Sequence, residues 1–221
     1  MSLCESLIRR RKPGRPAALS EAERRDQILD AAERCFVSQG YRSTQMDDVV
    51  KACGMSKKTV YRSFGTKENL FVALIDRVMH DDIALEMPED HQPADVVIAD
   101  ILSRLSAFVL SDRQVNITRL VISESAHAPE LAAAFHDNGL RCCKEKLTDI
   151  LRHLQATGRL KADRPAELAS LLVGAIIGES LVTALIRRPQ AMTDRDREGR
   201  IEHLLSLVRI SLMPERTAQT S

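Results

Sequence analysis

Three lysines stand at the starts of two predicted helices, where positive charges are unfavourable. Lys57 and Lys58 follow Ser56, and Lys67 follows Thr66; serine and threonine are residue types that cap helix starts. A cation in the first turn meets the positive end of the helix dipole, which costs roughly 0.3–1 kcal/mol before screening. The phosphate backbone of a nucleic acid would neutralise such lysines. The alternative is that they are solvated surface lysines, tolerated at small cost.

Two short helices joined by a glycine turn would position these lysines. Thr44 can cap the first helix with Asp47 three residues on, and Gly54 can end it in the left-handed conformation. Helical spacing gives each helix one apolar face, made of Met46, Val49, Val50 and Cys53 in the first and of Val60 and Phe64 in the second. This layout is that of a helix-turn-helix, which reads duplex DNA.

The distribution of charge agrees with a DNA-binding amino-terminal end. The whole chain has a net charge of +1, which by itself says nothing about nucleic acid. Residues 1–67 carry 14 Lys and Arg against 8 Asp and Glu, whereas the remainder carries 18 against 23. Such an asymmetry indicates a basic nucleic-acid-binding end on a more acidic body.

Residues 1–19 are predicted to form a flexible basic arm. The run from Arg9 to Lys12 is followed by Pro13-Gly14-Arg15-Pro16, which partly resembles an AT-hook. Arg15 would then enter a narrow A·T-rich minor groove, where the negative potential is enhanced. The alternative is a solvated tail that adds only non-specific attraction.

The residues around the glycine turn resemble those of the TetR family of bacterial transcription regulators. The resemblance rests on Gly54–Phe64 and Lys67–Leu70, together with the stretch from Arg25 to Tyr41. It covers about residues 22–82, with the helix-turn-helix motif at 45–64. It departs at Lys58, where many members carry glycine, and the lysine adds a charge near the phosphates.

This resemblance implies a set of DNA contacts. Lys57, Lys58 and Thr59 would approach base edges or flanking phosphates in the major groove, beside Ser56. Tyr61 would place its hydroxyl on a phosphate, or would pack half-buried on the first helix, or both. Thr44 and Lys67 would hold the DNA backbone from the starts of their helices.

The rest of the chain reads as helix, with no strand alternation. Predicted helices cover about residues 98–109, 117–125, 131–155, 165–187 and 194–212, and the third of these is expected to turn Leu140, Leu147, Ile150, Leu151 and Leu154 inward. The predicted fold is therefore all-α. A three-helix DNA-binding domain at residues 20–68 precedes a larger regulatory and dimerisation domain at 69–213 and a loose tail at 214–221.

The helix at 165–187 is apolar nearly all round, which predicts burial on both sides. Small residues one turn apart would let another helix approach closely. We expect a homodimer, because helix-turn-helix proteins read two-fold DNA sites; a core helix of a monomer is the alternative. Glu179 near the middle argues against a membrane span. The expected interface residues are Leu171, Gly174, Gly178, Leu181 and Leu205.

No motif for catalysis, a cofactor or a metal is present in the sequence. The six histidines are scattered, and the five cysteines have no metal-ligand spacing. The segment from Arg119 onward also resembles the AefR-like subtype of regulatory domain, through Arg119–Glu124, Pro129–Leu131 and Gly178–Leu181. Its effector is expected to be a small apolar molecule. Arg119, Glu124, His153 and Glu179 could line that pocket, or could equally be paired structural groups.

The sequence therefore predicts a cytoplasmic homodimeric repressor that an apolar effector releases from a palindromic DNA operator. The absence of a secretory signal supports the cytoplasm. Two alternatives remain open, a DNA-binding regulator gated by a protein partner and one gated by cysteine oxidation. An enzyme with an appended DNA-binding module has no catalytic residues to support it.

Overall fold

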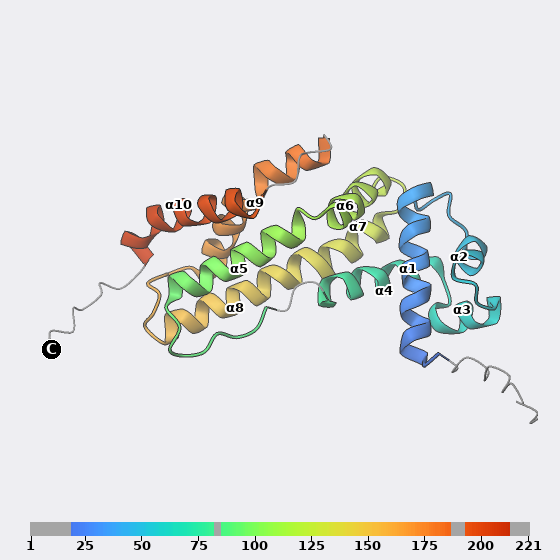
Figure 1. The fold of residues 1–221 in the computed structure, drawn as a ribbon, viewed down its shortest axis with the longest axis horizontal. Coiled ribbons are helices and arrows are strands. Elements are labelled where there is room, and N and C mark those ends of the chain that lie inside the picture. Colours follow the sequence, from blue (N-terminus) through green and yellow to red (C-terminus); the bar gives the residue numbers. More distant parts are fainter. Residues whose placement is uncertain (1–18, 82–84, 187–192, 213–221) are drawn as a thin grey trace, which may run out of the picture.

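The computed structural model describes residues 19–81, 85–186 and 193–212, and these ranges are helical with no strand (Figure 1). A small head at one end adjoins an elongated body. The head contains α1 (Glu21–Gln39), α2 (Met46–Cys53), α3 (Lys57–Phe64) and the start of α4 (Lys67–Asp81). The body contains α5 (Ala94–Val109), α6 (Asp112–Glu124), α7 (Pro129–Phe135), α8 (Cys142–Ala156), α9 (Pro165–Ile186) and α10 (Asp194–Leu212). The all-α prediction is confirmed.

The first helix begins with a capping box formed by Ser20 and Glu23. The backbone N–H of Ser20 donates to Glu23 Oε2 at 2.7 Å, and the N–H of Glu23 donates to Ser20 Oγ at 3.2 Å. This reciprocal cap satisfies two donors that the start of a helix would leave without partners. At the other end, the N–H of Gly40 donates to Phe36 O, and the chain leaves α1 there.

The prediction that Thr44 caps α2 is wrong. The residue before α2 is Gln45, whose N–H donates to Asp48 Oδ2 at 2.9 Å. Thr44 is fully buried and donates its hydroxyl to Gly40 O at 2.8 Å and Cys35 O at 3.2 Å. Carbonyls at the end of a helix lack partners within it, so Thr44 is drawn under the end of α1.

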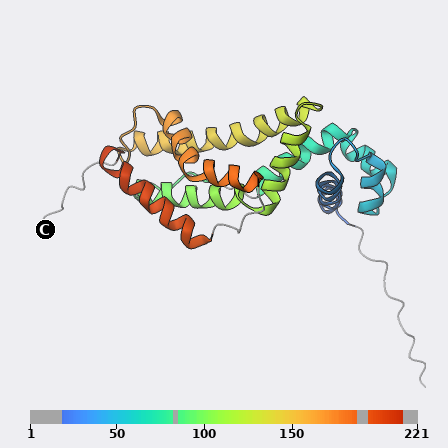
Figure 2. The same ribbon diagram turned by 90° about the horizontal axis from the view of Figure 1, so that it is seen from above.

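An aromatic cluster of Phe36, Tyr41 and Phe71 joins α1 to α4 in the core of the head. The ring centroids lie 5.4–5.9 Å apart, and all three residues are buried. The helix α4 packs against α1 in the head and against α7 in the body. Seen from above, it runs between the two parts (Figure 2). The head and body are therefore linked by a continuous helix.

The predicted long helix at 131–155 is present but contains a π-helical turn at His136–Arg141, between α7 and α8. This turn carries more residues per turn than an α-helix, so it changes which side chains face inward. Gly139 is buried, whereas Leu140 is 56% exposed. The prediction that Leu140 lies inside was therefore wrong, although Leu147, Ile150, Leu151 and Leu154 are buried as expected.

The apolar helix α9 is largely exposed in the single chain. By length and composition it could cross a membrane, with a mean hydropathy of 2.0 and only 28% of that window buried. One face packs on α8, α5 and α6. It also contacts α10, but Leu171, Val182 and Ile186 stay exposed, which leaves an apolar stripe uncovered in the described chain.

Candidate DNA-binding surface and regulatory body

The helix α3 is positioned by a turn and a cap that its sequence encodes. Gly54 adopts the left-handed conformation, with φ of 69°, and ends α2. Ser56 Oγ then accepts from the N–H of Thr59 at 3.1 Å and caps α3. Val60 and Phe64 are buried and anchor α3 in the head. The opposite face of α3 is left to solvent, as a reading helix requires.

Lys57 and Lys58 lie side by side in the sequence but in different electrostatic surroundings. Lys57 Nζ lies 2.8 Å from Asp47 Oδ1 and 5.6 Å from the centroid of the Tyr61 ring. The hydrogen bond that Lys57 donates to Asp47 and the negative charge of that carboxylate raise the pKa of Lys57. Lys58 is exposed, and no ion pair is found for it among the described residues. The two lysines therefore differ in how readily they can meet a phosphate.

Lys67 is turned inward. Its ammonium donates to the backbone oxygens of Tyr41 at 3.0 Å and Thr44 at 3.1 Å, and lies 4.3 Å from the centroid of the Tyr41 ring. An ammonium has three donors, so these contacts occupy most of its capacity. Lys67 thus stabilises the connection between α1 and α2.

The hydroxyl of Thr44 is buried and bonded to backbone oxygens in this conformation, and its predicted contact with the DNA backbone stays a prediction. Tyr61 is exposed on α3, so both of its predicted roles stay open. Arg25 of α1 stacks on the ring of Phe64 at 4.7 Å and was not singled out from the sequence. In the sequence, Arg25 could have been recognised as a cation on the first helix, which lies next to α3 in the head.

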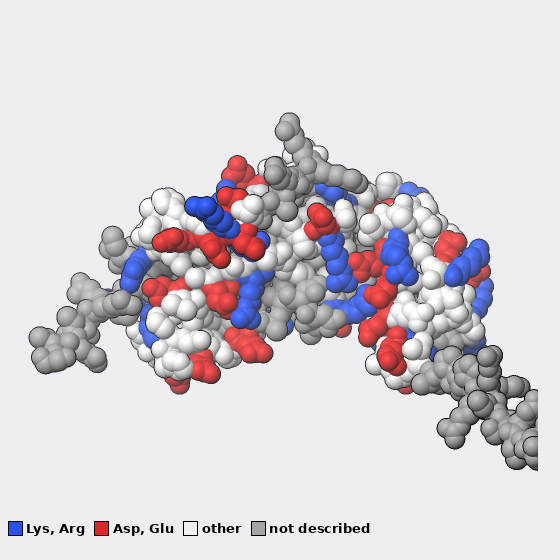
Figure 3. Space-filling view, in the orientation of Figure 1, with Lys and Arg blue, Asp and Glu red and all other residues white. Residues whose placement is uncertain are grey.

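The described part of the head is only weakly basic. Residues 19–67 carry nine Lys and Arg against seven Asp and Glu, so five of the 14 cations of residues 1–67 lie in residues 1–18. Acidic and basic side chains are interspersed on the visible face of the head (Figure 3). Arg15 and the rest of the predicted arm lie outside the described residues. Most of the predicted excess of positive charge therefore belongs to that arm.

The four predicted ligand residues do not come together. Arg119 of α6 donates to the backbone oxygens of Ala184 and Leu185 at the end of α9. Glu124, the last residue of α6, lies against Gly40. A Cβ built on that glycine would be 3.2 Å from Glu124 Oε1. Both residues therefore join elements of the fold.

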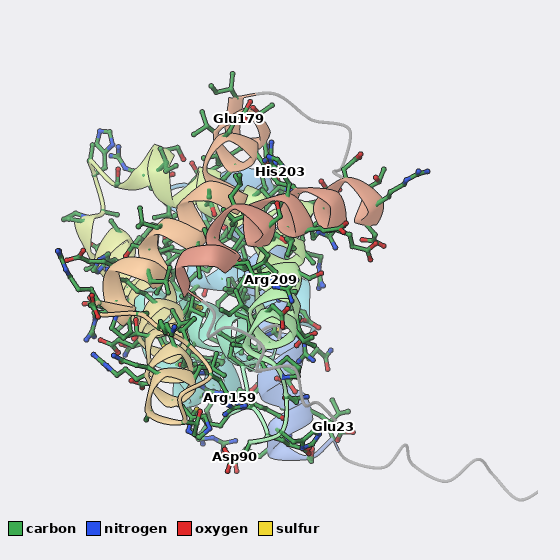
Figure 4. All side chains as sticks on the ribbon, turned by 90° about the vertical axis from the view of Figure 1, so that its left-hand side faces the viewer. Glu23, Asp90, Arg159, Glu179, His203 and Arg209 are labelled. Carbon is green, nitrogen blue, oxygen red and sulfur yellow. The ribbon has the colours of Figure 1, made fainter. Side chains whose placement is uncertain are left out.

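The other two lie elsewhere on the body. His153 Nε2 is 3.1 Å from Asp90 Oδ1. Asp90 lies in the loop before α5 and is also paired with Arg159. Glu179 is 84% exposed and lies 3.4 Å from Arg200 Nη2 on α10. Figure 4, which looks along the long axis, shows Asp90 and Arg159 on the lower side of the body and Glu179 on the upper side. These residues fit the structural alternative better than a shared pocket.

The uncovered face of α9 contains three of the five predicted dimer residues. Leu171 is 70% exposed, and Val182 and Ile186 are exposed on the same helix. A Cβ built on Gly174 or Gly178 meets nothing within 4 Å, so both glycines border open space. Leu181 and Leu205 are only partly buried and pack against the core.

Comparison with known proteins extends over most of the chain. Residues 28–74 match the family described as "Bacterial regulatory proteins, tetR family", and residues 97–208 match "AefR-like transcriptional repressor, C-terminal domain". The regulator TtgR of Pseudomonas putida is 25% identical over 200 residues, which cover 86% of this chain and 93% of TtgR.

Two further similarities differ in extent. The transcriptional activator FasR of Mycolicibacterium smegmatis is 36% identical over 84 residues, or 35% of this chain and 38% of FasR. The solved structure of the flavonoid-responsive regulator FrrA is 26% identical, with a TM-score of 0.73, and the match covers 88% of this chain and 99% of FrrA. The similarity to FrrA thus extends to head and body alike.

Proposed function

This chain belongs to the TetR family of DNA-binding transcription regulators, which is not a family of enzymes, and we propose that it is a homodimeric repressor. It would bind a palindromic DNA operator in the cytoplasm and leave it when a small apolar effector binds the body. The exposed face of α3 is the observation that carries this proposal. Ser56, Lys57, Lys58, Thr59 and Tyr61 lie on the cap and helix that Val60 and Phe64 anchor from behind.

The uncovered stripe on α9 supports the homodimer. Exposed apolar side chains on one helical face, with two glycines beside open space, favour close packing against another helix. A second copy of the same stripe would form a two-fold interface, which places two heads on one DNA duplex. The ion pair of Glu179 with Arg200 beside this stripe disfavours a lipid environment.

Repression and an apolar effector rest on the comparisons. The matched carboxy-terminal family is described as a repressor domain, although FasR, similar over the head, is an activator. FrrA is described as responsive to flavonoids, which are aromatic molecules with an apolar ring skeleton that bears polar hydroxyl groups. An effector of this class could shift the two heads only if it binds their two arrangements with different affinities.

Gating by cysteine oxidation is the weaker alternative. Burial raises the pKa of the thiols of Cys35 and Cys143, which keeps them protonated and poorly nucleophilic. A thiolate is the species that oxidants attack most readily. A regulator gated by a protein partner remains the second candidate, and the effector test below distinguishes it.

One experiment tests the proposal in two steps. The full chain is used to select duplexes from random DNA, and sedimentation gives the mass of the protein and of its complex. We expect a palindromic consensus bound by two chains and a promoter reporter that the protein lowers. Flavonoids added to the complex should then weaken binding. A non-palindromic site bound by one chain would contradict the dimer, and an activated reporter would contradict repression.

A further inference from the structure

Three carboxylates line one face of α1 in a head that the sequence marks as basic. Asp26, Asp30 and Glu33 are spaced four and three residues apart, so they lie on the same side of the helix. This side faces the body, away from the reading helix, since α1 packs on α4 and α6 as well as on α2. The partners of these carboxylates come from those two helices.

Glu33 forms a two-pronged pair with Arg113 of α6. Arg113 Nε donates to Glu33 Oε1 at 2.7 Å, and Arg113 Nη2 donates to Glu33 Oε2 at 2.7 Å, across 80 residues of sequence. The side chain of Glu33 is only 18% exposed. Parallel bonds of this kind fix the relative orientation of two groups, which a single contact does not.

Arg77 of α4 holds the same face of α1. Its Nη2 lies 2.8 Å from Asp30 Oδ1 and 3.6 Å from Glu33 Oε2, and its Nη1 donates to the backbone oxygen of Asp26 at 3.1 Å. The Arg77 side chain is 13% exposed. Glu33 is thus the residue of the head that both α4 and α6 reach.

These pairs border an open cleft. A space of about 850 Å³ lies between α1, α4 and α6, lined by Asp30, Glu33, Arg34, Val37, Ser38, Arg77, Arg113 and Asn116. Seven of these eight residues are polar or charged, although much of the surface that they present to the cleft is apolar. Head and body also share a hydrophobic core, but along this cleft they are bridged by polar side chains and not by close packing, so the bonds across it limit how far α1 can move relative to α6.

The helix α6 also connects to the proposed dimer helix. Arg119 donates to the carbonyls of Ala184 and Leu185 at the end of α9. Glu124 meets Gly40 at the end of α1, where the positive φ of 84° disfavours other residues and a Cβ would lie 3.2 Å from Glu124 Oε1. The helix therefore contacts α9 as well as α1, which it meets near Glu33 and at Gly40.

We infer that Glu33 is a positioning residue for DNA binding: through its pair with Arg113, α6 fixes the orientation of the head on the body. In the dimer proposed above, this orientation sets the spacing between the two reading helices. The first part of the test rests on that dimer. When the pair is lost, α1 is still attached through α4 and the aromatic cluster. The head therefore stays folded, but its orientation relative to the body varies more widely. The heads then accept operators of different spacing.

The first test measures the choice between two spacings. The operator selected from random DNA is compared with the same duplex carrying two extra base pairs between its half-sites, which turns one half-site by about a fifth of a helical turn. The wild-type protein should prefer the original spacing. Glu33→Gln and Arg113→Gln should each reduce that preference by about tenfold, and the double variant should reduce it no further, as expected for two residues acting through one contact.

A second measurement does not require a dimer. Labels placed at Lys51 in the head and Gln155 in the body report the spread of distances within one chain. Both glutamine variants should widen that spread, and Arg113→Lys, which keeps the charge but loses the fork, should give an intermediate width. Arg104→Gln is the control, because it breaks an exposed pair with Asp100 inside α5 and removes the same charge.

The outcomes separate this inference from the proposed function. An unchanged spread in Glu33→Gln and Arg113→Gln, or an equal effect of Arg104→Gln, would overturn the positioning role. If the chain sediments as a monomer but the spread of distances widens in these variants, the positioning role is supported and the dimer is rejected. Thermal unfolding of each variant shows whether the head is still folded, and Arg113→Gln alters only the partially exposed partner on the body.

Discussion

Lys57 at the start of α3 is paired with Asp47 at the start of α2, with 2.8 Å between Nζ and Oδ1. This pair explains how a cation is tolerated at the positive end of a helix dipole without DNA. A phosphate that approaches Lys57 must compete with the Asp47 carboxylate. We therefore expect Asp47 to limit how strongly α3 attracts DNA.

Asp47→Asn should raise the affinity for DNA of any sequence by several-fold at low salt. The substitution removes a negative charge from the surface and frees Lys57 for a phosphate. The dependence of log affinity on log salt should steepen by roughly one unit. Asp100→Asn, on the far part of the body, is the control with the same change of charge. If the affinity and the salt slope both stay at their wild-type values, Lys57 does not meet a phosphate.

Lys58→Ala and Lys67→Ala should fail in different ways. Lys58 is exposed, so its loss should reduce the salt slope by roughly one unit and leave the stability unchanged. Lys67→Ala removes the donor to the Tyr41 and Thr44 carbonyls, which should lower the free energy of unfolding by about 1–3 kcal/mol. Urea unfolding and salt titration separate the two effects. If Lys67→Ala has normal stability but a reduced salt slope, Lys67 contacts a phosphate, as the sequence predicts.

Gly178→Leu should convert the dimer into monomers. The glycine borders open space in the single chain, so leucine fits the monomer but obstructs a partner helix. The monomer should bind a palindromic operator at least tenfold more weakly, because the second half-site no longer assists the first. Sedimentation is the measurement. Gln155→Leu, which adds an apolar group to an exposed position on α8, should remain dimeric, and an intact Gly178→Leu dimer would place the interface elsewhere.

Tyr41→Phe should make the protein less sensitive to alkaline pH. Burial of the hydroxyl, followed by the negative charges of Glu68 and Glu130, raises the pKa of Tyr41 well above its ordinary value near 10. The unfolded chain loses this proton above pH ~10 while the folded chain keeps it, so stability falls as pH rises. The phenylalanine variant should lack this loss, which is at most about 1.4 kcal/mol per pH unit. Identical urea midpoints for the two proteins at pH 9 and pH 11 would contradict this expectation.

Deletion of residues 1–16 should weaken DNA binding without changing the stability of the described fold. The deletion removes Arg9, Arg10, Arg11, Lys12 and Arg15. If Arg15 enters the minor groove, operators with A·T-rich flanks should lose more affinity than operators with G·C-rich flanks. Equal losses that shrink in salt would instead mark the arm as a non-specific tether.

The local elements of this protein could be predicted from its sequence alone. The observed helix caps and the turn depend on contacts within four residues along the chain. They are formed by Ser20 with Glu23, by Gly54 and by Ser56. The buried faces of α1 and α3 follow in the same way from helical spacing. These signals were sufficient for the all-α fold and the DNA-binding motif, because hydrogen bonds within a helix depend on near neighbours.

Tertiary packing decided how the predicted site residues are used. Thr44 and Lys67 were expected to contact DNA, yet Thr44 donates to Gly40 O at the end of α1, and Lys67 donates to Tyr41 O and Thr44 O in the connection between α1 and α2. Leu140 faces solvent because of a π-helical turn that the spacing of apolar residues did not reveal. Arg113 and Glu33 are 80 residues apart, and only the packing of α6 across α1 brings them to 2.7 Å. The sequence shows that α1 has an acidic face, but a charge selects its partner only after the fold has placed the candidates within reach.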